Sequence, residues 1–488
     1  MSSTNSTDEA VTPLADQVPP QHLRGNMGVL QLFFTVMAFN APLVVVIGFI
    51  PVMIAYGNGI GTPAIFIVCG AIVLLFATGF TAMARHLPNP GGFYAYITAG
   101  LGKPVGLGSS FVALACYYFS LLSSYALGGM NANFIIHQTL GGPDVPWWVW
   151  SIALFVIVST LGYLRIDLSA KVLSVFLIAE LAIVVIYDLA VGIQGGASGF
   201  SLESFMPQAI MSGSIGLALM FGVGMFGGFE ATAIFRDEVK DPRRTVPRAT
   251  FLVICTVAVL YGLTAWVIIA SYGTGEVVAA ATADPAGSVQ ASIGLYAGHI
   301  IMDIAIVLMN TSTFAVLLSA HNITARYVFN LSADRILHHS LSRPHPRYGS
   351  PHRASVFTSI AAVVGLVPFV IAGAPVETLY AVFGGGFSYT LVALLFLTAL
   401  AIPFYMKRNR VSGVSNFTAV LAPGLAVIGF GIALVLSTQN FALLIGGSEP
   451  LAGLLFTIIY ALFALGVVMA VAFRKRRPDV YARIGRQE

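Results

Sequence analysis

Long runs of apolar residues, separated by short polar segments, are the main pattern along this chain. Each run has roughly the 20 residues that a helix needs to cross the hydrocarbon core of a membrane. The pattern therefore predicts an all-α polytopic membrane protein with about twelve transmembrane helices. The predicted spans are residues 28–56, 62–85, 105–137, 147–164, 168–193, 207–236, 248–272, 291–330, 354–373, 376–404, 415–437 and 450–473.

The composition agrees with a membrane protein. Hydrophobic residues make up 57% of the 488 residues and charged residues only 9%. Soluble globular proteins contain about 25% charged residues, so a soluble protein is excluded. Residues 1–26 are polar and contain no apolar core. They predict a disordered tail and not a secretory signal peptide.

The positive charges predict how the chain crosses the membrane. When the loops are assigned alternately, starting with the N-terminus inside, all 24 Lys and Arg residues fall in inside segments or within the last few residues at the inside end of a span. Lys and Arg are enriched on the cytoplasmic side of membrane proteins. The pattern therefore predicts an even number of spans in the cytoplasmic membrane, with both termini cytoplasmic.

Two of the predicted spans are interrupted. Residues 38–51 contain Pro42, which removes a backbone hydrogen bond from a helix interior. Residues 221–230 contain four glycines and end in the carboxylate of Glu230. Lipid cannot satisfy the backbone groups that a broken helix frees, so these groups must face protein, water or a bound solute. Matching interruptions five spans apart predict an inverted repeat with a binding site at its interface.

The freed helix ends are the predicted substrate site. Helix N-termini present N–H groups to a carboxylate and C-terminal ends present carbonyls to an ammonium, which suits a zwitterion. Close helix packing is the alternative function of the glycines. Polar and aromatic residues of other spans, among them Tyr117 and Asn310, are predicted to line the same cavity. The predicted substrate-binding residues at the breaks are Asn40, Ala41, Pro42, Leu43, Val44, Phe226, Gly227, Gly228 and Phe229.

Two carboxylates within predicted spans are candidates for coupling or gating. A charged group inside a membrane is costly and marks a functional site by default. Glu230 could carry a proton, hold a cationic cargo or lock the fold through hydrogen bonds. Glu180 lies in the middle of span 168–193 and could load and unload a proton. The alternative for Glu180 is a structural pair with a hydroxyl of span 291–330, such as Ser312, Thr313 or Ser319.

Three other charged features carry weaker predictions. Asp188 is predicted to lie at the membrane interface, near the outer end of its span. Asp303 lies inside span 291–330, where it could bind a cation. The loop from Arg236 to Arg248 contains both signs of charge, which predicts either an inner gate or a simple topological anchor.

Three segments of the chain resemble the amino acid–polyamine–organocation superfamily of transporters. GGFYAYITAGLGKPVGLGSSF at 91–111 is similar to the loop and short helix between that family's second and third spans. GGFEATAIFRDEVKDPRRTVPRA at 227–249 resembles its sixth span and the following loop. SAHNITARYVFNLSADRIL at 319–337 is similar to the end of its eighth span.

The resemblance implies a leucine-transporter-type fold with two inverted five-helix repeats and two further helices. On this chain, the core is residues 27–404, with repeats at about 28–193 and 207–404. The two further helices lie in 405–473 and a basic cytoplasmic tail in 474–488. The resemblance also implies secondary active transport of amino acids or related amines, often driven by a proton gradient.

The first span departs from the family pattern. Many members have a Gly-x-Gly whose backbone amides hold a substrate carboxylate, whereas residues 40–44 here read Asn-Ala-Pro-Leu-Val. Pro42 supplies no amide. The first span therefore supports an ordinary α-amino acid substrate less strongly than the family pattern does.

The expected function is import of an amino acid or related amine, powered by protons, with sodium as the other possible ion. The alternatives are an exchanger, a polytopic membrane enzyme and a channel. No catalytic motif, filter-like motif or ATP-binding GxxxxGK[ST] sequence supports the enzyme, channel or primary pump. We expect a small-molecule substrate and the lipid bilayer as partners, with no cofactor, metal or nucleic acid. The oligomeric state is left open.

Overall fold

The computed structural model describes residues 27–87, 92–164, 170–234, 239–346, 350–444 and 448–485. These ranges are helical, and their one β-type contact is an isolated bridge between Met27 and Val239. The predicted tail at 1–26 and the acidic residues Asp237 and Glu238 of the charged loop lie outside the described residues.

Ten helices in the described part of the chain are long and apolar enough to cross a membrane. They confirm ten of the predicted spans, and the chain is therefore a multi-pass membrane protein. These helices are α4 (Thr62–Ala84), α6 (Lys103–Phe134), α7 (Trp147–Leu164), α8 (Ala170–Gln194), α12 (Pro242–Tyr272), α15 (His299–Ala333), α16 (His352–Ile371), α17 (Val376–Arg408), α18 (Ala422–Leu444) and α19 (Glu449–Arg476).

The first predicted span is divided into short segments. They are α1 (Val29–Asn40), α2 (Pro42–Val44), a π-helical turn (Val45–Phe49) and α3 (Ile50–Tyr56). Ala41 separates α1 from α2 with φ 46° and ψ 72°, in the left-handed region. The helix axis bends by 41° across this break. We call Ala41 and the start of α2 the first break.

The sixth predicted span is also divided. After α9 (Pro207–Ile210), the chain forms α10 (Ile215–Gly224), a series of turns at 225–230, and α11 (Ala231–Ile234). Gly228 has φ 104°, a conformation that side-chain-bearing residues rarely adopt. We call residues 225–230 the second break.

The predicted span 291–330 is wrong at its start. The membrane-length helix begins at His299, and α13 (Val277–Ala283) and α14 (Pro285–Ala297) precede it. Gly298, with φ 95°, separates α14 from α15. Because apolar residues continue on both sides of this glycine, hydropathy alone joined the two helices. Asp303 consequently lies in the second turn of α15 with its side chain exposed, and not deep inside a span.

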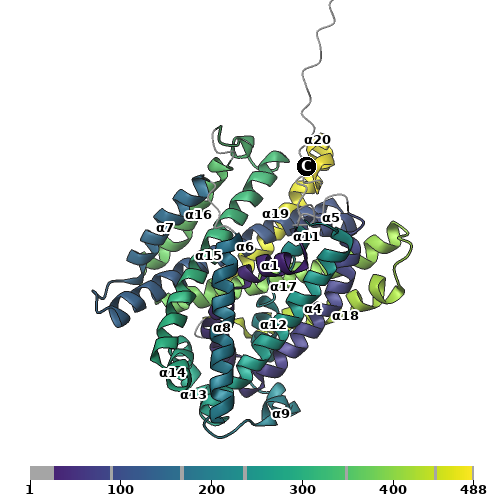
Figure 1. Ribbon diagram of the computed structural model, residues 1–488. Helices are drawn as coiled ribbons and strands as arrows, with labels where there is room; N and C mark the ends of the chain where they lie inside the picture. The colour runs from purple at the N-terminus through teal and green to yellow at the C-terminus, as the bar shows by residue number, and fades with distance from the viewer. Residues whose placement is uncertain are drawn as a thin grey trace, which may run out of the picture.

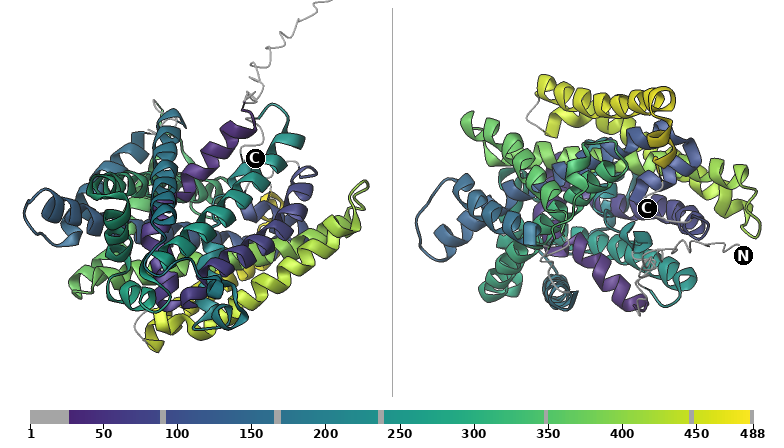
Figure 2. Two further views of the ribbon diagram at one scale, coloured as in Figure 1. Left: turned by 60° about the horizontal axis from the view of Figure 1, so that its bottom comes forward. Right: turned by 90° about the horizontal axis from the view of Figure 1, so that it is seen from above.

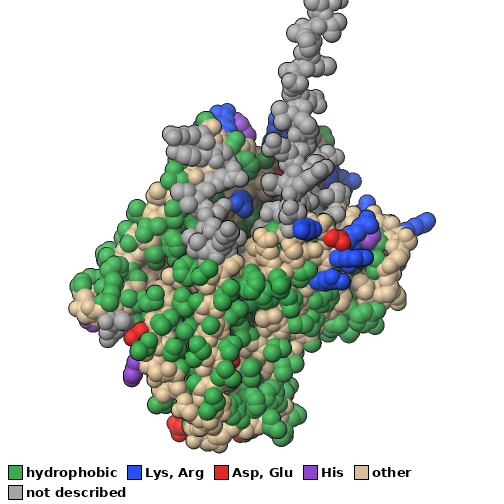
Figure 3. All heavy atoms as spheres, in the orientation of Figure 1, with side chains coloured by type: hydrophobic (Ala, Val, Ile, Leu, Met, Phe, Trp, Pro, Cys, Tyr) green, Lys and Arg blue, Asp and Glu red, His purple; other side chains and the backbone are tan. Residues whose placement is uncertain are grey.

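The helices pack into one bundle around the two breaks. α17 packs against α6, and α12 packs against α4, while α19 lies along one edge (Figures 1 and 2). Two short helices, α5 (Gly92–Leu101) and α20 (Pro478–Arg483), lie close together at the end where Lys and Arg side chains gather (Figures 1 and 3). Lys103 donates there to the carbonyl of Tyr481 at 2.9 Å. We call this the basic end.

Candidate substrate site between the two breaks

A cavity of about 220 Å³ lies between the first and second breaks. Its walls come from the two breaks and from α6, α15 and α17. It is lined along α6 from Tyr117 to Leu127 and along α15 from Val316 to Tyr327. Its polar side chains are Asn40, Tyr117, Ser120, Ser123, Ser124, Glu230, Ser319, Arg326, Tyr327 and Tyr380.

Glu230 is the carboxylate of this cavity. Its side chain accepts a hydrogen bond from the backbone N–H of Gly228 at 2.8 Å, within the same break. The hydroxyl of Tyr117 donates to its other oxygen at 3.4 Å. The residue is 6% exposed, so its carboxyl group has little contact with water. Glu230 therefore presents a carboxyl group to whatever enters the cavity.

Asn40 connects the two breaks. Its amide nitrogen donates to the carbonyl of Met225 at 2.6 Å and to that of Gly227 at 3.3 Å. Its amide oxygen accepts a hydrogen bond from the hydroxyl of Tyr261 on α12. One side chain thus satisfies two carbonyls that the second break frees and holds the end of α1 against them.

Glu180 lies outside the cavity lining and contacts the first break. It is 3% exposed and accepts a hydrogen bond from the backbone N–H of Leu43 at 3.2 Å. The hydroxyl of Ser312, one of the partners considered from the sequence, donates to its other oxygen. Thr313 instead donates to the carbonyl of Met309 at 2.8 Å within its own helix. Glu180 therefore joins α8, the first break and α15.

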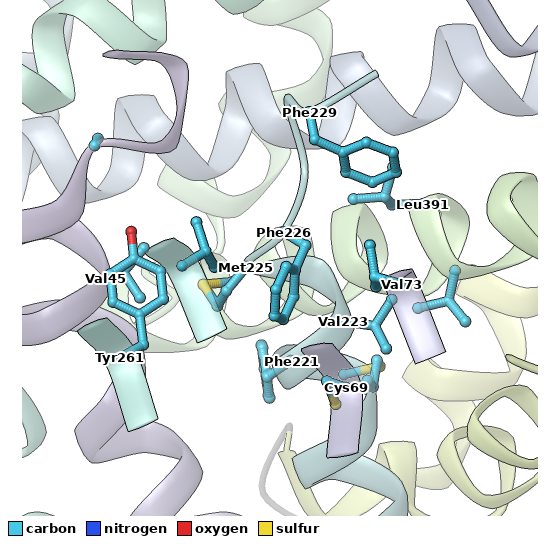
Figure 4. Packing of buried hydrophobic residues seen from close by; sticks show 14 of the residues in the cluster. Val45, Cys69, Val73, Phe221, Val223, Met225, Phe226, Phe229, Tyr261 and Leu391 are labelled. Carbon is cyan, nitrogen blue, oxygen red and sulfur yellow. The ribbon is translucent and has the colours of Figure 1, made fainter. Parts of the chain in front are cut away.

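Several predicted binding residues lie away from the cavity. Phe226 and Phe229 point into the packed interior, near Val73 and Leu391 (Figure 4). Phe229 packs edge-on against Phe76, with ring centroids 5.9 Å apart. Pro42, Leu43 and Asn310 are also absent from the cavity wall, and the amide of Asn310 donates to Ile306 in its own helix at 3.0 Å. Asn40, Ala41, Val44, Tyr117, Gly227 and Gly228 do line it.

Several cavity residues were not predicted from the sequence, among them Arg326, Tyr327 and Tyr380. Tyr327 stacks near Tyr117, with ring centroids 5.4 Å apart, and Arg326 precedes it on α15. Tyr380 lies 5.3 Å from the ring of Phe49, and its buried hydroxyl has no hydrogen-bond partner among the described residues. A signal for the α15 wall was present, because the lining residues Val316, Ser319, Ala320, Ile323, Arg326 and Tyr327 are spaced by three and four positions, as on one helix face.

The remaining acidic candidates lie elsewhere. Asp188 accepts a hydrogen bond from Thr264 of α12 at 2.8 Å, and its other oxygen is buried without a partner among the described residues. Its carboxylate therefore faces a neighbouring helix, near the end of α8 where the sequence placed it. In the charged loop, Asp241 and Arg244 form an exposed ion pair at 3.8 Å. The described residues contain no group of three potential metal ligands.

Comparison with known proteins identifies the family. Residues 35–481 match the family described as amino acid permease. The chain belongs to the amino acid permease family. This membership makes it a transporter of the amino acid–polyamine–organocation superfamily and not an enzyme.

The relatives are distant in sequence, and the share of the chain that they match varies. The amino-acid permease RocC of Bacillus subtilis (strain 168) is 24% identical over 77% of this chain and 80% of its own length. The branched-chain amino acid permease BcaP of the same organism is 24% identical over 64% of this chain and 68% of its own. The low-affinity putrescine importer PlaP of Escherichia coli (strain K12) is 24% identical over 37% of this chain and 40% of its own.

Proposed function

We propose that this permease imports an amino acid or a related amine across the cytoplasmic membrane by alternating access, driven by a proton gradient. The observation that carries the proposal is the cavity between the two breaks, with Glu230 in its wall. Broken helices that meet near the middle of a bundle are typical of secondary transporter sites. The names of the relatives, which include permeases for amino acids and an importer for putrescine, support the same range of cargo.

The proposal includes a twelve-span arrangement. In it, the first and sixth spans cross the membrane as broken helices, the two five-span repeats are inverted, and α18 and α19 follow them. The alternation of Lys and Arg supports cytoplasmic termini, so the basic end faces the cytoplasm. The cavity wall on α15 reaches Tyr327, six residues before that helix ends. This geometry suits a state that releases cargo to the cytoplasm.

Glu180 is the proposed proton site. Both of its oxygens accept hydrogen bonds, from Leu43 and from Ser312, which suits the ionised carboxylate. A proton on Glu180 would require the Ser312 hydroxyl to turn and accept it, and would weaken the bond to Leu43. Proton binding is thereby linked to the first break, which forms part of the cavity wall.

Uptake into proteoliposomes tests the proposal. The purified protein is reconstituted, and labelled amino acids and small amines are supplied with and without an inward proton gradient, and again with sodium. Concentrative uptake that follows the proton gradient is the expected result. Uptake that follows only sodium would replace the coupling ion, and uptake only into preloaded vesicles would identify an exchanger. No uptake of any compound would contradict the transporter proposal.

A further inference from the structure

The first break has few N–H groups to offer a cargo carboxylate. Pro42 has none, and the N–H of Val44 is bonded to the carbonyl of Ala41 at 2.9 Å. The N–H of Leu43 is bonded to the carboxylate of Glu180 at 3.2 Å. A protonated carboxyl still accepts through its carbonyl oxygen, so Glu180 occupies this N–H in either protonation state. In other transporters of this type, the N–H groups at a helix start can bind the carboxylate of the cargo. Here the carboxylate of Glu180 takes that position.

The second break is satisfied in the same manner. The carbonyls of Met225 and Gly227 accept from the amide of Asn40, and the carbonyl of Gly224 accepts from the N–H of Gly227 at 3.0 Å. Groups of the protein itself therefore occupy many of the backbone N–H and carbonyl groups that a zwitterionic cargo would use. Recognition is left to the side chains that face the cavity.

Those side chains suit an organic cation. Glu230 is the one carboxylate among the described lining residues. The rings of Phe49, Tyr117, Tyr327 and Tyr380 stand in the same wall, and aromatic faces attract ammonium groups. The buried hydroxyl of Tyr380, unpartnered among the described residues, can accept a further hydrogen bond from the cargo.

The geometry points to a monoamine with an apolar body, and no carboxylate, as the cargo of this cavity. This inference rests on the proposed function and narrows it to one substrate class. The ammonium pairs with Glu230, and the apolar body lies against the aromatic rings. A second ammonium would have no second carboxylate in the described wall. Arg326 is the cationic side chain of the described wall with which a cargo carboxylate could pair, which defines the competing outcome.

Ligand-induced thermal stabilisation of the full-length protein in detergent tests the inference without requiring transport. A ligand that binds the folded state raises its melting temperature in proportion to the logarithm of its concentration over its Kd. The probes are matched pairs that differ only by a carboxylate: 3-methylbutylamine with leucine, and 2-phenylethylamine with phenylalanine. Putrescine serves as a diamine.

We expect each amine to stabilise the protein at about tenfold lower concentration than its amino acid, or lower, a preference equivalent to about 1.4 kcal/mol. Putrescine is expected to raise the melting temperature less than the monoamines do at the same concentration. Glu230→Gln should remove the shift, because the amide keeps an acceptor for Gly228 but carries no charge. Glu203→Gln, at an exposed carboxylate outside the cavity, should keep it.

Equal or stronger stabilisation by the amino acids would overturn the inference. If Arg326→Gln then abolished the stabilisation by the amino acids, Arg326 would be the residue that binds the cargo carboxylate. Stabilisation by putrescine above the monoamines, or by none of the probes, would also overturn it. The two proposals fail in different ways. Amine binding without any uptake would contradict the proposed import but would not contradict the inferred class of ligand.

Discussion

The two breaks differ in what holds them. At the first, the freed N–H of Leu43 is bonded to Glu180, which comes from α8 and is itself bonded to Ser312 of α15. At the second, Glu230 folds back onto the N–H of Gly228 in its own segment and faces the cavity. Neighbouring helices contact both breaks, the second through Asn40 and Tyr117, but of the two carboxylates only Glu230 lines the cavity.

This difference indicates that similar interruptions in two helices can serve separate tasks. In the proposed mechanism, the carboxylate that bridges three helices responds to a proton by loosening them. A carboxylate that faces a cavity is placed to bind. Asn40 joins the two regions, because this one side chain of α1 donates to two carbonyls of the second break.

The largest expected effect is at Glu230. Glu230→Gln should lower uptake of the preferred amine by about 100-fold or more, because removing one partner of a buried ion pair costs roughly 3–5 kcal/mol. Initial rates in proteoliposomes measure this loss, with Glu203→Gln as the matched exposed control. Retention of most of the activity would show that the second break does not hold the charged end of the cargo.

A smaller but still marked effect is expected at Asn40. Asn40→Ala removes the hydrogen bonds to Met225 and Gly227 and leaves the hydroxyl of Tyr261 without this partner. Each buried group left unpaired costs about 1–3 kcal/mol, so the melting temperature and the uptake rate should both fall. An unchanged melting temperature would mean that the two breaks are not held together by this side chain.

Gly228→Ala should have a moderate effect. Gly228 has φ 104°, where a Cβ adds strain of about 1–2 kcal/mol, and its N–H holds Glu230. Gly262→Ala on α12 is the matched control, since its added Cβ would meet its nearest neighbour at 3.4 Å, an ordinary contact. Thermal unfolding of both variants should show destabilisation only for Gly228→Ala; equal behaviour would contradict the strained geometry.

The smallest effect is expected at Asn310. Its amide donates to Ile306 within its own helix and lies outside the cavity wall. Asn310→Ala should leave cargo affinity within about twofold, the range of surface substitutions that change free energies by less than about 0.5 kcal/mol. A large loss of affinity, measured by competition, would place Asn310 at the site after all.

Hydropathy predicted ten of the spans because length and apolar content are local properties of the chain. It failed at Gly298, where one apolar run covers two helices separated by a single positive-φ residue. Glycines and Pro42 marked where the helices would be interrupted, but they could not show which partners satisfy the freed groups. The bond from Leu43 to Glu180 joins residues 137 positions apart, and only the folded packing brings them together. The sequence could not distinguish Ser312 from the other candidate hydroxyls, and the packing of the helices shows that Ser312 is the partner of Glu180.

The division of labour between the two carboxylates is tested most directly with Glu180→Gln in proteoliposomes. Gradient-driven accumulation and exchange of preloaded amine are measured in the same vesicles. The amide mimics the protonated carboxyl, because it can accept from Leu43 and donate to Ser312, so cargo can still bind while the proton can no longer be loaded or released. We predict that accumulation is abolished and exchange retained. Unchanged, pH-dependent accumulation in this variant would contradict the assignment of Glu180 as the proton site.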